Sequence, residues 1–274
     1  MIRLIHANVA YGDFKSPYQR VLALFFPRVH RRAHEPGRVV LSDVTLQLTH
    51  GAALAVLGDA DALFRLIAGE VSCSEGTAEI RGHVVRVDGG ETLLPFLSGR
   101  GNARLFARLY GCNRQEVSEL LAAVEASAAF GDRFTVPVKR YCAEERALLS
   151  LSVALALHPD TLLIDGGLSA LSPARLSALL SRLRAELLSG MCLLLHAPQE
   201  IASLVCRRAV WIENGRVQRL GSFAEVAAAR RIARCQKRLT VCTPKSAFVG
   251  VAKKCPAHED APRPPHAAGL LSFH

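Results

Sequence analysis

The amino-acid sequence predicts an α/β fold with a largely parallel central sheet. Strand-like and helix-like segments alternate along most of the chain, which is the pattern of strands joined by crossover helices. Short runs that are wholly or mostly apolar, such as Ala53–Leu57, Thr161–Ile164 and Met191–Leu195, are typical of strands buried on both faces. The 274 residues, half of them apolar, are enough to bury a sizeable core in one or two domains.

The first third of the chain alternates between strands and one helix. Strands are expected at Ile2–Ala10, over residues 44–48 where apolar and polar residues alternate, and at Ala53–Leu57. After Gly58 the apolar residues recur at helical spacing and end at Gly69, which predicts a helix. Two further strands are expected at Thr77–Ile80 and His83–Val87.

The remainder of the chain is richer in helix. The expected helices cover residues 103–129 with a break at Gly111, then 144–157, Ser172–Leu188 and Gln199–Cys206. A hairpin is expected from Ala209 to Leu220, because Asn214-Gly215 is a strong two-residue turn signal. From Ala227 a basic helix is compatible with the sequence as far as Leu239. The prolines that follow predict that residues 240–274 are disordered.

The net charge of +10 lies entirely on the two flanks of the chain. Residues 1–38 carry +5 and residues 227–274 carry +7, whereas residues 39–226 carry −2. The basic flanks are either a solvated face or a surface attracted to anionic lipid. Nucleic acid is the less favoured partner, because the aromatic residues between Asp13 and Arg38 are not spaced like a base-stacking platform.

The cysteines and the apolar runs indicate where the protein works. The eight cysteines include no CxxC pair, so they predict neither a zinc ribbon nor a thioredoxin-type site, and we expect reduced thiols. No apolar run approaches the roughly 18 residues that would predict a membrane span, and the start lacks the profile of a signal peptide. We therefore expect a soluble, cytoplasmic protein.

Several segments, in this order, resemble one protein family over residues 1–226. They are Leu41-Ser42-Asp43-Val44-Thr45-Leu46 followed by Gly51, Leu66-Ile67-Ala68-Gly69 with Glu75-Gly76-Thr77, Leu97–Arg104 with Phe106–Gly111, Pro137–Tyr141 with Arg146, and Leu162-Leu163-Ile164-Asp165. Each is a weak match alone, but their order over more than 200 residues is specific. The chain resembles the ATP-binding subunit of an ABC transporter, in the branch that serves exporters of capsule, O-antigen and teichoic acid.

The resemblance implies a fold, ligands and partners. It implies a nucleotide-binding domain over residues 1–226, with a P-loop NTPase-like parallel sheet, an antiparallel β subdomain and a helical subdomain at about 97–158. It implies ATP and Mg²⁺ as ligands, a dimer with itself or with another ABC ATPase, and a polytopic membrane permease as partner. The protein would then lie at the inner face of the plasma membrane, with residues 227–274 as a basic tail.

The same resemblance assigns four site positions. Tyr11 matches the aromatic residue that stacks on adenine, and His196 matches the switch histidine that contacts the γ-phosphate. Asp165 matches the Walker B aspartate that holds Mg²⁺, and Tyr141 matches the tyrosine that begins the signature motif. Taken alone, Tyr11 and His196 are equally compatible with packing at a strand end. Asp165 could instead form a hydrogen bond with the turn that follows it.

The phosphate-binding loop departs from the family pattern. This loop needs glycines, a lysine and a hydroxyl residue between a strand and a helix, so that backbone N–H groups and the lysine hold the phosphates. Only Asp59-Ala60-Asp61-Ala62 separates Gly58 from Leu63, where the family has eight residues. Two carboxylates would repel a polyphosphate. We expect Asp59 or Asp61 to cap the new helix, with a residual phosphate contact as the alternative.

The other catalytic motifs are also altered. The Walker B glutamate, which would orient the attacking water, is replaced by Gly166. The signature motif is replaced by Tyr141-Cys142-Ala143-Glu144-Glu145, whose glutamates suit a helix start but oppose a phosphate. Without the lysine, the glutamate and the signature, hydrolysis at this chain's own site is not expected. Whether the chain is an enzyme stays open at this stage.

The sequence leaves four functional hypotheses. The leading one is an exporter ATP-binding subunit with a degenerate ATP site. The others are a non-catalytic regulator or heterodimer partner of an intact ABC ATPase, a decayed homologue without function, and a nucleic-acid-binding adaptor.

Overall fold

The structure, a computed structural model, describes residues 1–11 and 38–241. The chain divides into one compact unit, Met1–Arg234, and a second unit that begins at Cys235. The aromatic segment that follows Asp13 and the expected disordered region beyond Val241 lie outside the described residues.

The described residues contain one nine-stranded sheet in the order β4-β1-β2-β9-β8-β3-β7-β6-β5. Its strands are β1 (Ile2–Tyr11), β2 (Arg38–Leu48), β3 (Ala53–Gly58), β4 (Glu75–Ile80), β5 (Val84–Val87), β6 (Thr161–Asp165), β7 (Cys192–His196), β8 (Arg208–Glu213) and β9 (Arg216–Ser222). Each strand expected from the sequence is present, and the largest difference is β2, which starts six residues earlier than the alternating pattern.

The sheet has a parallel part and an antiparallel part. Strands β5, β6, β7, β3 and β8 pair in parallel, as the apolar runs predict. Strands β1, β2 and β4 pair antiparallel, and β2 joins the rest through one parallel pair, Ser42 with Arg216. The hairpin of β8 and β9 turns at Asn214 and Gly215, whose φ angles of 51° and 72° are those of the favoured hairpin turn. The predicted fold class is confirmed.

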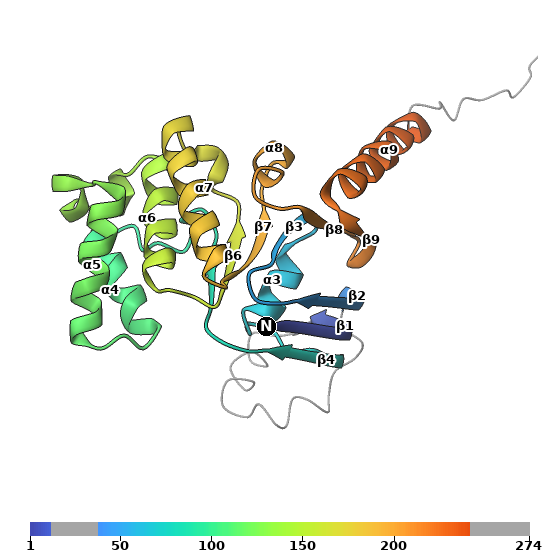
Figure 1. Cartoon of the computed structure of the whole chain (residues 1–274), viewed down its shortest axis with the longest axis horizontal. Coiled ribbons are helices and arrows are strands. Elements are labelled where there is room, and N and C mark those ends of the chain that lie inside the picture. Colours follow the sequence, from blue (N-terminus) through green and yellow to red (C-terminus); the bar gives the residue numbers. More distant parts are fainter. Residues whose placement is uncertain (12–37, 242–274) are drawn as a thin grey trace, which may run out of the picture. The chain divides into compact units, whose positions relative to one another are not determined.

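The helices lie mainly between β5 and β8 along the chain. They are α3 (Asp61–Ile67), α4 (Gly99–Leu109), α5 (Arg114–Ala128), α6 (Ala143–Ala156), α7 (Pro173–Leu188), α8 (Gln199–Ala202) and α9 (Phe223–Val241). Figure 1 shows α4, α5 and α6 gathered as a helical group beside the parallel strands, with β1, β2 and β4 forming a separate antiparallel group. The helical group falls within the expected 97–158.

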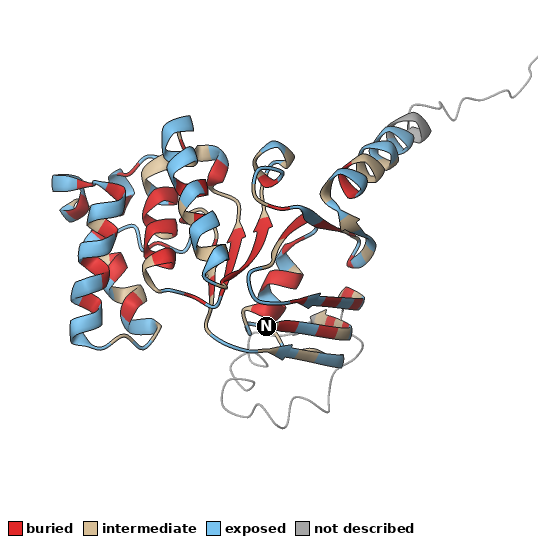
Figure 2. Cartoon of the chain, viewed as in Figure 1, coloured by how far each residue is buried: buried red, intermediate tan, exposed pale blue. Residues whose placement is uncertain are grey.

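The core lies on both faces of the parallel strands (Figure 2). Because side chains alternate along a strand, Ala55 and Leu57 of β3 face the cluster formed with α4, α5, α6 and α7. Leu54 and Val56 face the opposite cluster, which includes α3 and the inner residues of β1 and β2. The short helix α3 therefore sits on the face that the antiparallel strands also cover.

The carboxyl-terminal helix extends beyond the expected domain boundary. The expected boundary between residues 226 and 227 falls inside α9, which runs from Phe223 to Val241. Val226 and Ala227, on either side of this boundary, are both buried in the core. The basic helix compatible with the sequence is therefore present. None of the helices within residues 1–11 and 38–241 combines the length and apolarity that crossing a membrane requires. The cysteines described, such as Cys192 and Cys206, are free thiols.

Candidate functional site

The turn between β3 and α3 is the place where a phosphate-binding loop was expected. Gly58 ends β3 and α3 begins at Asp61, so only Asp59 and Ala60 connect the strand to the helix. The N-cap residue of α3 is Ala60, whose side chain cannot accept a hydrogen bond. The prediction that Asp59 or Asp61 caps α3 is therefore wrong. Asp61 still lies in the first turn, where its charge complements the helix dipole.

Gly58 and Asp59 bind the β8–β9 hairpin instead. The Asp59 backbone N–H donates to the Ile212 carbonyl oxygen at 3.0 Å, and the Asp59 carboxylate accepts from the Asn214 backbone N–H at 2.9 Å. Gly58 has a φ of +100°, and a Cβ atom there would collide with the Ile212 carbonyl oxygen. The turn is thus packed against a neighbouring strand by its own backbone, which explains why Asp59 is not available to α3.

The Asp61 side chain forms an ion pair with Arg86. Arg86 lies on β5, and its side chain is 17% exposed. One of its terminal nitrogens, Nη2, is 2.9 Å from Asp61 Oδ1 and 3.0 Å from Asp165 Oδ2. The other, Nη1, is 3.3 Å from Glu70 Oε1. Arg65 also contacts the Asp61 carboxylate, with its Nε at 3.0 Å. Arg86 therefore joins carboxylates from three separate segments.

Asp165 and His196 lie side by side at the carboxyl ends of β6 and β7. His196 Nδ1 is 2.9 Å from Asp165 Oδ1. The hydrogen bond with His196 holds the pKa of Asp165 below its ordinary value, although burial opposes this, and Arg86 lowers the same pKa further. Because an ionised carboxylate only accepts, His196 Nδ1 carries the proton of this hydrogen bond. The two residues placed by resemblance are thus brought together.

Arg86 is held in its charged form by this surrounding of carboxylates. Burial of the guanidinium lowers its pKa, but the hydrogen bonds with Asp61 and Asp165 and the charge of Glu70 raise the pKa above the ordinary arginine value. Asp165 therefore contacts Arg86 and His196. Among residues 1–11 and 38–241, no group of three His, Cys, Asp or Glu side chains is arranged to hold a metal ion.

These residues do not fit Mg²⁺-ATP in the way the fold family binds it. The connection of two residues lacks the N–H groups that wrap a β-phosphate. The carboxylates of Asp59 and Asp61 lie at the helix start, and Arg86 already neutralises Asp165. Gly166, which replaces the catalytic glutamate, has a φ of +84°, a conformation that a glutamate adopts only with strain. No catalytic step can be assigned to this site.

The residues that replace the signature motif have structural partners. Glu145 accepts from the Cys142 backbone N–H at 2.8 Å and from Arg133 Nη2 at 2.6 Å. The first of these bonds caps the amino-terminal end of α6. Glu144 accepts from the Ser172 backbone N–H at 2.7 Å, so it joins α6 to the start of α7. Both glutamates therefore hold helix ends, in agreement with their expected position at a helix start.

Of the two aromatic residues predicted for the site, the structure describes the side chain of Tyr141 but not that of Tyr11. Tyr141 is 4% exposed, and its hydroxyl group donates to the Arg133 carbonyl oxygen at 2.6 Å within the helical group. It stacks on Phe130 and is not brought to Asp165 or His196. Tyr11 ends β1, where its backbone pairs with Arg38. Its side chain lies outside the described residues.

The sequence analysis missed Arg86, Glu70 and Asn214. A signal for Arg86 was present, because it is the one charged residue in the otherwise apolar run Val84–Val87, and a charge in a short buried strand needs a partner. Glu70 and Asn214 had no comparable signal. Glu70 lies after Gly69, beyond the end of α3. Asn214 contributes its backbone N–H, which any non-proline residue has.

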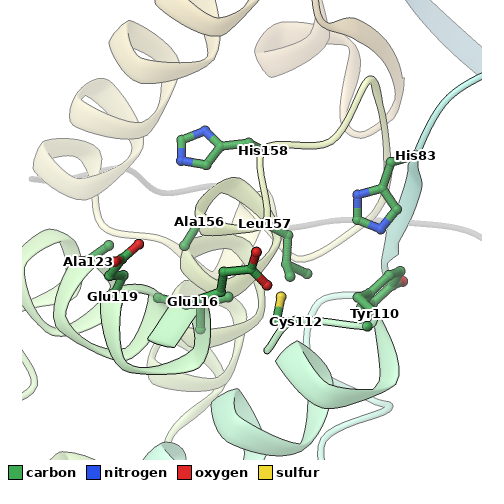
Figure 3. Close-up of a pocket in the computed structure, with 11 residues that line it drawn as sticks. His83, Tyr110, Cys112, Glu116, Glu119, Ala123, Ala156, Leu157 and His158 are labelled. Atoms are coloured by element: carbon green, nitrogen blue, oxygen red, sulfur yellow. The ribbon is translucent and has the colours of Figure 1, made fainter. Parts of the chain in front are cut away.

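A separate pocket lies at the opposite ends of the parallel strands (Figure 3). It has a volume of about 410 Å³ and is lined by His83 before β5, His158 before β6, the α4–α5 connection, α5 and the end of α6. The ring of His83 packs edge-on against Tyr110, with 5.0 Å between centroids. Asp165 and His196 are the last residues of β6 and β7, whereas His83 and His158 lie before the first residues of β5 and β6. The two histidines are therefore at the other ends of the strands, while Tyr110 of the same pocket lies close to the Arg86 backbone and Glu70.

Comparisons with known proteins place this geometry in a fold family. A solved ATP-binding subunit of an ABC transporter matches with a TM-score of 0.66 and 19% identity, over 88% of this chain and 99% of that chain. A dimeric ATP-binding cassette in a post-hydrolysis state, bound to ADP and phosphate, matches with a TM-score of 0.65 and 15% identity, over 81% of this chain and 99% of that chain. The chain has the nucleotide-binding fold of ABC ATPases.

The sequence comparisons narrow the resemblance to one branch. The Levilactobacillus brevis "Teichoic acids export ATP-binding protein TagH" is 26% identical over 231 residues, 82% of this chain and 63% of that protein. The Klebsiella pneumoniae "O-antigen export system ATP-binding protein RfbB" is 28% identical over 195 residues, 69% of this chain and 79% of that protein. No family model matches the chain.

These similarities confirm the resemblance predicted from the sequence, which is to the polysaccharide-export branch of the ABC ATPases. The chain spans less than two thirds of the length of the first three teichoic-acid relatives, at 63%, 41% and 61%. What those complete proteins transport and bind is therefore not transferred to this chain by similarity alone.

Proposed function

We propose that this protein is an ATP-binding-subunit-like component of an ABC transporter that exports a capsule-type polysaccharide, and that its own nucleotide site does not hydrolyse ATP. The observation that carries the second part is the β3–α3 connection, in which Asp59 and Ala60 alone replace the phosphate-binding loop. The first part is supported by relatives named for export of teichoic acid and O-antigen.

The partners follow from the same proposal. A polytopic membrane permease would anchor the subunit at the inner face of the plasma membrane. A second ATP-binding subunit, identical or different, would complete the dimer, as in the dimeric cassette of the same fold. If the partner is an intact ATPase, ATP bound there would meet Cys142, Glu144 and Glu145 of this chain in place of a signature motif. This chain would then be a non-catalytic partner.

The test of the proposed function is nucleotide binding and hydrolysis by the purified protein. Isothermal titration with Mg²⁺-ATP is expected to give no binding in the micromolar range, because the carboxylates of Asp59 and Asp61 repel the phosphates. ATP turnover is expected to stay at background with and without the permease in membranes. An intact ABC ATPase in the same assay is the positive control. Micromolar binding with turnover would overturn the proposal.

The alternative is a regulatory subunit or a decayed homologue, and the two differ in a measurable way. The observation that favours a working subunit is that the altered positions have new partners, such as Glu144 with Ser172 and Glu145 with Arg133. A regulatory subunit is expected to co-purify with the permease and to change the ATP turnover of an intact partner. A decayed homologue is expected to do neither.

A further partner in this proposal is an anionic membrane surface. Near its end the first unit carries three arginines within five residues of α9, at Arg230, Arg231 and Arg234. The pKa of Arg230 lies below its ordinary value, first because of burial and then because of the nearby Arg234. An anionic headgroup would relieve this repulsion. Binding to vesicles with phosphatidylglycerol but not to phosphatidylcholine vesicles is expected, and equal binding to both would contradict it.

A further inference from the structure

Three carboxylates from separate segments meet at the Arg86 site. Asp61 opens α3, Glu70 lies three residues beyond its end, and Asp165 ends β6. Asp61 and Glu70 are about half exposed, whereas the Asp165 side chain is 20% exposed. Three like charges at one place would repel each other strongly where water is partly excluded. A fold that brings them together requires a cation among them.

Arg86 is placed to be that cation. Its guanidinium group contacts all three carboxylates at 2.9 to 3.4 Å, and it is the least exposed member of the cluster. Its Nε atom is buried without a hydrogen-bond partner, so the contacts of the group are made through its two terminal nitrogens. These nitrogens are the groups that point toward the carboxylates.

We infer that Arg86 is a built-in cation that takes the place of the missing lysine and Mg²⁺-nucleotide at this end of the sheet. The inference rests on the proposed function, since it explains how a site that lacks the phosphate-binding loop stays charge-balanced. Proteins that bind phosphate at a helix N-terminus gain order there from the ligand. In this chain the Arg86 guanidinium group, which is always present, orders the start of α3 through its contact with Asp61.

The length of α3 makes this role necessary. Helix α3 has seven residues, and helices this short are not stable on their own. Arg86 contacts Asp61 at the start of α3 and Glu70 just beyond its end, while its strand pairs with β6 next to Asp165. The guanidinium group therefore holds both ends of α3 to the parallel sheet, in addition to the apolar contacts of Leu63 and Phe64.

Chemical rescue with free guanidinium tests the inference on nucleotide-free, full-length protein. Arg86→Ala is expected to lower the melting temperature by about 5–10 °C, because three neighbouring carboxylates, of which Asp165 is largely buried, lose the cation that they share. Guanidinium chloride at about 50 mM, where its denaturing effect stays small, is expected to raise the melting temperature of this variant relative to the same concentration of NaCl.

The matched control is Arg104→Ala, an exposed arginine of α4 that makes no ion pair within the described part of the chain. The control and the wild type are expected to melt at similar temperatures and to be slightly destabilised by guanidinium. Equal melting temperatures for Arg86→Ala and Arg104→Ala would overturn the inference. A fall with guanidinium in every variant would overturn it as well.

A second variant keeps the test decisive if Arg86→Ala does not fold. Adding Asp61→Asn and Asp165→Asn to Arg86→Ala removes two of the three repelling charges, so folded protein is expected to return. A triple variant as unstable as the single one contradicts the inference. The proposed function is tested by a different measurement, the ATP turnover of the wild type. Turnover would contradict the proposed function but would not change the expected rescue of Arg86→Ala by guanidinium.

Discussion

Gly58 occupies a position where both the backbone angle and the available space require glycine. Its φ is +100°, and the Ile212 carbonyl oxygen lies where a Cβ atom would be. Gly58→Ala is expected to destabilise the protein by about 3 kcal/mol or more, because a backbone atom cannot move aside as a side chain can. Gly69→Ala is the control, since Gly69 also has a positive φ of 76° but nothing lies within 4 Å. It is expected to lose about 1 kcal/mol from strain alone. Urea unfolding of both variants measures the difference, and equal losses would contradict the argument.

Glu145 gives a pH dependence whose sign follows from its partners. The hydrogen bond from Arg133 lowers the pKa of Glu145, against the effect of burial, and the Cys142 backbone N–H lowers it further. The ionised form therefore favours the folded state. This contribution is fully present above the ordinary glutamate pKa of about 4.3 and is lost as the pH falls through the lower pKa of the folded state.

Glu145→Gln is accordingly expected to lower the melting temperature at pH 7 by about 2–4 °C, since the glutamine keeps an acceptor but loses the charge. Melting curves of wild type and variant from pH 7 to pH 3 check the sign. The difference is expected to shrink toward zero at the acidic end. A difference that stays constant over this range would show that the charge of Glu145 contributes nothing.

At the scale of elements, the β3–α3 turn and the β8–β9 hairpin depend on each other. The Asp59 carboxylate accepts from the Asn214 backbone N–H at 2.9 Å. Asp59→Ala is expected to lose about 1 kcal/mol and to speed amide exchange at Asn214, whereas Asp59→Asn keeps an acceptor and is expected to lose less. Hydrogen exchange of the two variants measures this. Equal exchange at Asn214 in wild type and Asp59→Ala would contradict the bond.

The elements were predictable from the sequence to a much greater extent than the site. Apolar runs such as Ala53–Leu57 and Thr161–Ile164 mark buried strands because the strands bury both faces, and Asn214-Gly215 marks a turn because both residues tolerate positive φ. The partners of charged side chains carry no such local signal. Asp61 and Arg86 are 25 positions apart, and only the parallel pairing of β5 with β6 brings Arg86 next to Asp165.

The incorrect cap prediction for Asp59 and Asp61 has the same origin. Local propensity favours an aspartate at the start of a helix, and this is the information that the sequence contains. The structure uses the two carboxylates for contacts with Asn214 and Arg86, which are distant along the chain. A tertiary partner therefore decided the role of each aspartate.

At the scale of the whole molecule, the chain has the fold of the ABC ATPases, and the loss of phosphate-binding groups is part of the proposed function. The sheet order and both cores are complete, and the structural match extends over 88% of the chain. The net charge of +10 is not at the nucleotide site, because residues 39–226 carry −2 and Asp59 and Asp61 lie at the start of α3. Under the proposed function, stability and nucleotide binding are separable properties in this fold.

This separation predicts an assembly that does not respond to nucleotide. In ABC cassettes ATP lies between two subunits, held by the phosphate loop of one and the signature motif of the other, so it draws the dimer together. This chain has carboxylates in both places, at Asp61 and at Glu144 and Glu145. Sedimentation velocity of the purified protein is expected to give the same coefficient with and without Mg²⁺-ATP, with an intact ABC ATPase as the positive control. A shift from monomer to dimer on adding Mg²⁺-ATP would mean that phosphate is bound by groups other than these, and the electrostatic account of the site would then be wrong.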